Sequence, residues 1–470
     1  MIELVENLEL VNKLRNIVKT HNGWLELRYQ RRKINSFLVK KGRIDSSTAS
    51  FKQGVGVRVL KNGTWGFAST SNLDESEILK TIKQAVTSAE LTGSNKNKRR
   101  VTLHKTNLSQ GVFTPEVNSY LEFIPVSEKI NFLLKSEEYM RKLSKNIIST
   151  TCKYTEIIDY KIIISSDGAD LIIYDSKPEI NFVAVVGKNG TSSVSTKACG
   201  LTGGWDDLFS RVDPEKWAEK VVKKASDLNK AKHVDGGTYD VILAPDLVGL
   251  LAHEAIGHTV EADFVLAGSV AKNLLNKKVA SSLVTLIDTG ESLFKPHAGG
   301  ELLVDDEGVK TKPVYIIKNG ILKSYLHNRQ SAKKFNVEPT GNARAYNYSN
   351  EPIIRMRNTC IAPGKSKLKD MISSIDNGFF LTGGGSGQAD SNAEFMFGVD
   401  EIYQIKKGKL GKLFKGATIS GQAFDVLKSI TAVSDDFKWD LGSGYCGKGQ
   451  MAKVDAGGPY VKCKMTIGGR

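Results

Sequence analysis

The sequence is poor in cysteine and contains no paired arrangement of it. Its 470 residues hold five scattered cysteines and no CxxC pair: Cys152, Cys199, Cys360, Cys446 and Cys463. An odd, dispersed set argues against a disulfide-based scaffold and favours a reducing compartment. We therefore predict a cytoplasmic protein in which most of these thiols act as small buried hydrophobes.

Long apolar runs are also absent. No stretch approaches the roughly 18 residues that a membrane-spanning helix requires, so a membrane partner is not expected. Residues 1–6 are acidic and amphipathic, unlike a basic leader followed by an apolar core, so we expect no signal peptide. With 40% hydrophobic and 25% charged residues, the composition is that of a globular protein long enough for two or three domains.

Acidic residues are fewer than basic ones, and the formal net charge is +15. Residues 1–105 hold 20 Lys and Arg against 9 Asp and Glu, with basic clusters at 31–33 and 96–100. Such clusters can contact polyanions. Because no nucleic-acid motif accompanies the charge, we predict a solvated basic surface and do not expect nucleic acid as a partner. A basic protein that binds nucleic acid through residues 1–105 is the last of three functions considered for the chain; the other two follow below.

Hydrophobic periodicity predicts an α+β protein. Helical spacing recurs in residues 4–20, 74–91, 127–144 and 213–228, whereas short alternating segments fill 24–67 and 147–198. These patterns predict an N-terminal antiparallel sheet with helices on it. The segment His233-Val234-Asp235-Gly236-Gly237 then marks the best boundary, which gives an N-terminal α+β domain, 1–235, and a C-terminal domain, 236–470.

The second domain is predicted to be β-rich, either barrel-like or a curved sheet, and to carry the helical segment 247–265. Strand-type segments recur at 239–243, 283–287, 313–318, 353–358 and 401–405, while helices are few. The segment Gly383-Gly384-Gly385-Ser386-Gly387 is predicted to be a flexible loop. It lacks a following Lys-Ser or Lys-Thr, so we do not expect it to cradle phosphate.

The most informative segment is His253-Glu254-Ala255-Ile256-Gly257-His258, within the apolar stretch 247–265. Imidazole is a good zinc ligand, and a carboxylate next to a metal-activated water can serve as general base. In a regular α-helix, histidines at i and i+5 lie roughly 140° apart, too far round to share one ion. A π-type widening to about 4.4 residues per turn brings them back to roughly 50°. We therefore predict a broken or widened helix at 256–258, where Gly257 would tolerate the distortion.

Several further blocks accompany this motif in the second domain. In order they are Thr259-Val260-Glu261-Ala262-Asp263, Asp305-Asp306-Glu307-Gly308, Asn319-Gly320-Ile321-Leu322-Lys323, Met356-Arg357-Asn358-Thr359, Phe395-Met396-Phe397, Lys415-Gly416-Ala417-Thr418-Ile419, Cys446-Gly447-Lys448 and Thr466-Ile467-Gly468-Gly469. With them the chain resembles the TldD/PmbA family of zinc metallopeptidases, and specifically its catalytic TldD branch. PmbA-like members lack the metal motif. One departure lies after the first glycines of the glycine-rich segment. In many family members this segment runs directly into Gln-Val-Asp, whereas here Ser386-Gly387 stand before Gln388-Ala389-Asp390.

The resemblance implies a zinc site and assigns its residues. Cys446 would complete the Zn²⁺ ligand set with His253 and His258, and Glu254 would act as the catalytic general base. A thiolate with two neutral imidazoles leaves a fourth tetrahedral position for water. The residues alone leave open that Cys446 is a buried structural thiol in a glycine-rich turn. The sequence does not identify the group that would stabilise the oxyanion formed during peptide hydrolysis. His297 and His327 are considered for this role, but we predict that they are surface or hydrogen-bonded histidines.

The resemblance also implies a function and a partner. The chain would be a zinc-dependent peptidase hydrolysing peptides or unfolded polypeptide segments inside a chamber. That chamber would be enclosed by two subunits, as a homodimer or a heterodimer with a PmbA-like paralogue. The alternative is a metal-bearing, peptide-binding subunit that acts with a partner protein and has little activity of its own.

Overall fold

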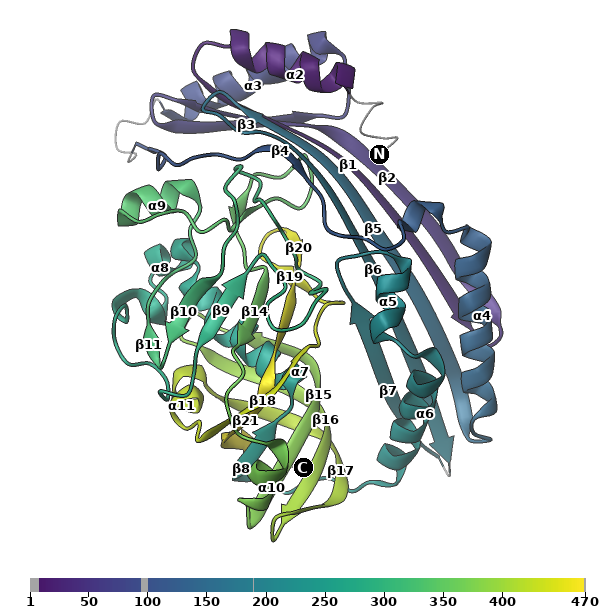
Figure 1. The fold of residues 1–470 in the computed structure, drawn as a ribbon. Helices are drawn as coiled ribbons and strands as arrows, with labels where there is room; N and C mark the ends of the chain where they lie inside the picture. The colour runs from purple at the N-terminus through teal and green to yellow at the C-terminus, as the bar shows by residue number, and fades with distance from the viewer. Residues whose placement is uncertain (1–7, 94–99, 189, 469–470) are drawn as a thin grey trace.

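The computed structural model describes residues 8–93, 100–188 and 190–468 (Figure 1). Residues 4–7 of the first predicted helix, residues 96–99 of the second basic cluster and Gly469 of the last sequence block lie outside these ranges. A long, curved N-terminal sheet carries helices at both of its ends, and a compact β-rich C-terminal part lies against its concave side. The predicted α+β class is confirmed.

The N-terminal sheet has seven strands in the order β3-β2-β1-β5-β6-β4, with β7 beside β6. All neighbours are antiparallel except β4 and β6. The strands are β1 (Trp24–Lys40), β2 (Arg43–Lys61), β3 (Thr64–Thr70), β4 (Gln110–Phe113), β5 (Ile147–Ser165), β6 (Asp170–Lys188) and β7 (Thr191–Gly200).

Alternation along β1 explains why both faces of this sheet are buried. Leu25, Leu27 and Tyr29 point into a core closed by α2 (Leu8–Thr20) and α3 (Glu75–Gly93). Because successive strand residues face opposite sides, the polar residues between them point to the other face, toward the C-terminal part. The far end of the sheet packs against α4 (Val126–Lys142), α5 (Trp205–Arg211) and α6 (Pro214–Lys230).

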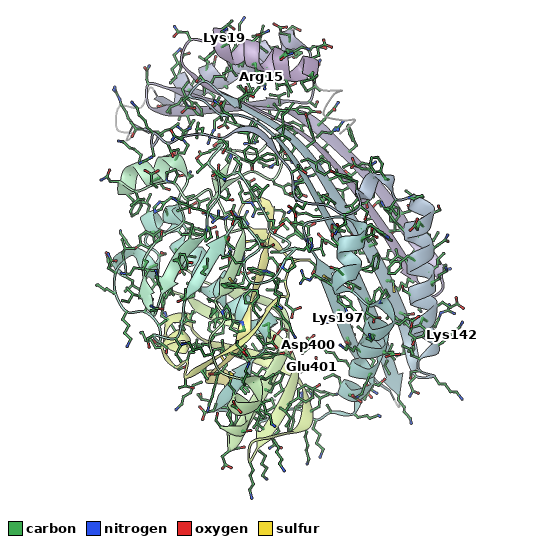
Figure 2. The ribbon with its side chains drawn as sticks, viewed as in Figure 1. Arg15, Lys19, Lys142, Lys197, Asp400 and Glu401 are labelled. Carbon is green, nitrogen blue, oxygen red and sulfur yellow. The ribbon has the colours of Figure 1, made fainter. Side chains whose placement is uncertain are left out.

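Buried ion pairs join the sheet to the C-terminal part. Arg58 Nη2 lies 2.9 Å from Glu26 Oε2 within the sheet and 3.0 Å from Glu307 Oε1 across the junction. Lys161 Nζ lies 2.7 Å from Asp306 Oδ1. At the opposite end of the junction Lys224 on α6 pairs with Asp400 and Glu401, which Figure 2 labels beside Lys197. The interface is therefore specified by charge pairs that desolvation makes costly to break.

The C-terminal part forms a ten-stranded sheet in the order β11-β10-β9-β14-β21-β17-β16-β15-β8. Because β21 also pairs with β8, the five strands β8, β15, β16, β17 and β21 close into a ring, and β18 adds to β21. The prediction of a barrel-like, β-rich part is confirmed. The strands are β8 (Gly237–Leu243), β9 (Leu286–Thr289), β10 (Val314–Lys318), β11 (Ile321–Leu322), β14 (Asn358–Ile361), β15 (Asn377–Ala389), β16 (Glu394–Lys406), β17 (Lys409–Gln422), β18 (Ala432–Trp439) and β21 (Asp455–Ile467).

Short elements complete the C-terminal part. They include two small hairpin sheets, β12 with β13 and β19 with β20. The short elements are α8 (Ala262–Ala267), η4 (Val270–Asn273), α9 (Arg329–Phe335), β12 (Ala343–Arg344), β13 (Ile353–Ile354), α10 (Leu368–Ser373), α11 (Ala423–Lys428), β19 (Tyr445–Gly447) and β20 (Met451–Lys453), with η1 (Leu121–Phe123) in the N-terminal part. The predicted division of the chain into domains 1–235 and 236–470 stays a prediction.

The glycine-rich segment is part of β15, so the prediction of a flexible loop was wrong. Its register against β16 shifts between Gly384 and Gly387, which marks an irregularity inside a paired strand. The backbone N–H groups of Gly383 and Gly384 donate to Asp246 Oδ2 at 2.6 and 2.7 Å. Gly383 has a φ of +80°, which suits glycine and turns its N–H toward that carboxylate. The segment thus anchors the start of the helix that carries the histidines.

Among the described residues, no helix is long and apolar enough to cross a membrane.

Candidate metal centre

The helix carrying the two histidines packs against strands β14, β15, β18 and β21. It comprises α7 (Pro245–Leu250), the π-helix η2 (Leu251–Gly257) and the 3₁₀ turn η3 (His258–Val260). Apolar side chains on every side of it belong to the core of the C-terminal part, as expected for a helix that is hydrophobic all round. The predicted widening is confirmed, and it begins at Leu251, before the expected 256–258.

The role of Gly257 differs from the predicted one. Its φ of −55° and ψ of −47° are ordinary helical values, so the widened turn does not depend on glycine's conformational freedom. A Cβ at this position would instead lie 1.9 Å from Sδ of the fully buried Met356. A side chain at this position would therefore displace the end of the Met356 side chain, which comes from the segment between β13 and β14.

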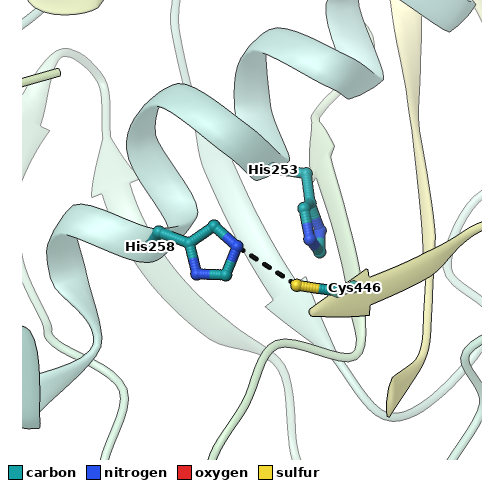
Figure 3. A group of neighbouring side chains, drawn as sticks. All are labelled: His253, His258 and Cys446. Carbon is teal, nitrogen blue, oxygen red and sulfur yellow. Dashed lines mark hydrogen bonds between the residues drawn. The ribbon is translucent and has the colours of Figure 1, made fainter. Parts of the chain in front are cut away.

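The π-helix brings the two imidazoles to the same side, where Cys446 meets them (Figure 3). The rings of His253 and His258 have centroids 5.4 Å apart. Sγ of Cys446, on β19, lies 3.1 Å from Nε2 of His258. One ligand-type atom from each of the three residues lies within 4.8 Å of the other two. All three residues singled out from the sequence are therefore brought together.

The electrostatics of Cys446 and His258 favour an ion pair. Burial alone would raise the pKa of the Cys446 thiol, but the neighbouring imidazoles of His253 and His258 lower it to about 4. Burial would lower the pKa of His258, whereas its contacts with Cys446 and Glu261 raise it to about 10. Without a metal ion, these pKa values favour a Cys446 thiolate paired with a His258 imidazolium. Metal binding would displace the proton that His258 then carries.

His253 provides a separate indication of a ligand. Its side chain is buried, and neither ring nitrogen has a hydrogen-bond partner of normal geometry among the described residues, although the ring is near enough to Cys446 to affect its pKa. An unpartnered imidazole in a core is costly unless something else binds it. Tetrahedral zinc with bonds of about 2.1–2.3 Å needs ligand atoms about 3.5 Å apart. Cys446 Sγ and His258 Nε2 lie 3.1 Å apart, and all three ligand-type atoms lie within 4.8 Å of one another, so the donor set fits zinc.

Glu254 lies at the edge of the same group. Its Oε2 is 3.7 Å from Nε2 of His258, and its side chain is 28% exposed, more than that of any of the three candidate ligands. The carboxylate therefore adjoins the imidazole nitrogen and still reaches solvent. This is the placement that a general base acting on water requires.

Two further residues, Glu261 and Arg355, contact the candidate ligands, and Lys448 contacts Glu261; the sequence analysis assigned none of the three a role in the site. Glu261 Oε2 lies 3.1 Å from Nδ1 of His258, and Lys448 Nζ donates to the same oxygen at 3.0 Å. Arg355 Nη2 donates to the Cys446 carbonyl at 2.6 Å. Glu261 could have been found from its i+3 spacing to His258. Arg355 carries no local signal of this contact.

The two remaining candidate histidines are hydrogen-bonded elsewhere. His297 Nδ1 lies 3.2 Å from the Thr202 carbonyl, and His327 Nδ1 lies 3.1 Å from Ser331 Oγ. His327 is also buried beside Tyr325 and Phe335. The prediction that both are hydrogen-bonded residues outside the centre is confirmed.

Comparisons with known proteins cover nearly the whole chain. Family models of PmbA/TldA metallopeptidases match as domain 1 at residues 25–89, the central domain at 119–229 and the C-terminal domain at 236–469. A metalloprotease TldD homolog from Buchnera aphidicola is 33% identical, covering 96% of this chain and 94% of its own. A zinc metalloprotease TldD homolog from Saccharolobus solfataricus is 31% identical, covering 95% and 97%.

Solved structures share the fold. A Thermotoga maritima protein described as a candidate modulator of a DNA gyrase superposes with a TM-score of 0.79 at 22% identity, covering 98% of this chain and 99% of its own. TldE from Thermococcus kodakarensis gives a TM-score of 0.77 at 18% identity, covering 97% and 99%. At these identities the likeness concerns the fold alone.

Proposed function

We propose that this chain, which belongs to the TldD/PmbA family of metallopeptidases, is a zinc-dependent peptidase with its centre at His253, His258 and Cys446. The observation that carries the proposal is the convergence of these three ligand-type atoms within 4.8 Å. Two come from one turn of widened helix and the third from a hairpin 188 positions after His258. Such a set has no structural use that explains the unpartnered imidazole of His253.

The chemistry assigns each residue a role. Zinc held by the two imidazoles and the thiolate would supply a Lewis acid that polarises a peptide carbonyl and lowers the pKa of water. Glu254 takes a proton from the attacking water and delivers it to the leaving amine. Its exposed carboxylate permits that exchange, while the burial of His253 and Cys446 keeps the ligands out of bulk solvent.

Metal analysis and peptide cleavage test the proposal together. Purified wild-type protein should carry about one equivalent of zinc and cleave a labelled unstructured peptide. Glu254→Gln should keep the zinc and lose about 10²–10⁴-fold in turnover, the usual contribution of a general base. A variant that keeps full turnover would exclude Glu254 as the base. Turnover absent from the wild type, with zinc bound, would favour the peptide-binding subunit that needs a partner.

The proposal extends to an assembly and a location. A second subunit, either another copy or a PmbA-like paralogue, would enclose the centre and limit access to peptides and unfolded segments in the cytoplasm. This part of the proposal rests on the resemblance to the TldD/PmbA family. Light scattering of the chain alone and mixed with its paralogue distinguishes the two dimers.

A further inference from the structure

Lys448 lies where the two ligand-bearing segments meet. Its Nζ donates to Glu261 Oε2 at 3.0 Å, to Asp263 Oδ1 at 2.8 Å and to the Ile354 carbonyl at 3.1 Å. An ammonium has three protons, so all of its donors are used. The side chain is only 12% exposed, and its ammonium lies 4.2 Å from the centre of the Phe264 ring.

Glu261 links this ammonium to the imidazole of His258. The side chain of Glu261 is wholly buried, and its Oε2 contacts both Lys448 Nζ and Nδ1 of His258. With Nδ1–H donating to Glu261, Nε2 of His258 is directed at Sγ of Cys446. A carboxylate behind a ligand imidazole fixes the ring's orientation and makes it a better ligand.

Lys448 also determines where the sulfur lies. It immediately follows β19, two residues after Cys446, and its contacts tie that hairpin to the turn that follows His258. Among the described residues, the other hydrogen bond that joins the hairpin to this part of the helix is the one between Cys446 Sγ and His258 Nε2. Arg355, which holds the Cys446 carbonyl, lies between β13 and β14. One charged side chain thus couples the positions of an imidazole and a thiolate that are remote in the sequence.

We propose that Lys448 and Glu261 are positioning residues that preassemble the metal centre, Glu261 by orienting His258 and Lys448 by holding Glu261 and the Cys446 hairpin in register. The inference rests on the proposed function, because it presumes that the three residues bind zinc. Lys448 does not touch the reacting atoms, so its effect is on metal affinity and ligand geometry.

Zinc affinity of the full chain tests the inference. Lys448→Met and Glu261→Gln should each weaken zinc binding, measured by competition with a chelator, by about 10–100-fold, as the loss of such supporting contacts does. Cobalt(II) substituted for zinc should show altered d–d absorption in both variants, a change that a purely structural role would not produce. Lys428→Met is the matched control: it removes an exposed lysine that pairs with Asp425 and, among the described residues, contacts neither Glu261 nor the Cys446 hairpin, so its zinc affinity should stay close to wild type.

Three outcomes are decisive. Lys448→Met that binds zinc as tightly as wild type, with an unchanged cobalt spectrum, overturns the inference and leaves the proposed function intact. Wild-type protein that takes up no zinc overturns both. If Lys448→Met does not unfold cooperatively in its metal-free form, Glu261→Gln, which keeps the side chain's shape, decides by the same two readouts.

Discussion

Sγ of Cys446 lies 3.1 Å from Nε2 of His258 across 188 positions of sequence. If this sulfur is a ligand, Cys446→Ser should lose most of its bound zinc, because a serine hydroxyl stays protonated and is a poor zinc ligand. Metal analysis of purified protein measures the loss. Cys199→Ser is the control, since this thiol is also buried and lies outside the centre; it should retain zinc. Equal zinc in both variants would remove Cys446 from the ligand set.

Gly257→Ala should destabilise the protein by about 1–3 kcal/mol through overpacking. The new Cβ would lie 1.9 Å from Sδ of Met356, a buried side chain that would have to move. Urea unfolding of the metal-free protein measures the cost, and adding Met356→Ala should recover part of it in a double-mutant cycle. Gly411→Ala, where the added Cβ meets only ordinary contacts, should change stability by no more than about 0.5 kcal/mol. A fully additive cycle would contradict the proposed clash.

Arg58→Met should cost about 3–5 kcal/mol, because it leaves Glu26 and Glu307 buried without their cation. The matched control is Lys61→Met, which breaks the half-exposed pair with Glu90 and should cost about 1 kcal/mol at most. Thermal unfolding of both variants at neutral pH compares the two. Costs of similar size would show that the junction does not depend on this charge pair.

His327 should make the protein less stable in acid. Burial lowers its pKa in the folded protein to about 4, from about 6.5 when unfolded. Between these values the unfolded chain binds a proton that the folded chain does not, so the free energy of unfolding falls as the pH drops through this window. The shift corresponds to about 3 kcal/mol. His327→Gln should therefore lose less stability than wild type between pH 6.5 and pH 4, measured by urea unfolding.

The control for that experiment is His233→Gln, which removes an exposed histidine without disturbing the core. His327→Gln is expected to start from a lower stability at pH 7, because its packing against Phe335 is lost. The change in the free energy of unfolding with pH, and not its value at pH 7, therefore decides between the two outcomes. Identical slopes for His327→Gln and wild type would assign the acid sensitivity to other groups.

The sequence was most informative where the chemistry is local. The i, i+5 spacing of His253 and His258 is incompatible with a shared ion on a regular helix, and this conflict alone predicted the widened turn that the structure contains. Alternating strands and the positions of the long N-terminal helices followed from periodicity in the same way. Segments whose pattern extends over several residues are the easiest to predict.

Relationships that depend on tertiary packing could not be read from the sequence. Nothing local connects Cys446 with a helix 188 positions earlier, and only the family resemblance suggested it. The glycine-rich segment 383–387 was mistaken for a loop because its partners, β16 and the carboxylate of Asp246, are remote in the chain. The function of Gly257 was misread for the same reason, since Met356 approaches from another segment.

Pairing of β8 with β21 has a consequence for biosynthesis. A nascent polypeptide that has emerged only as far as Lys428 possesses both imidazoles, but neither the sulfur of Cys446 nor β21, the strand that closes the ring. If the chain is the proposed peptidase, its metal centre could be assembled only once translation is almost complete, which would keep an unfinished chain inactive on the ribosome.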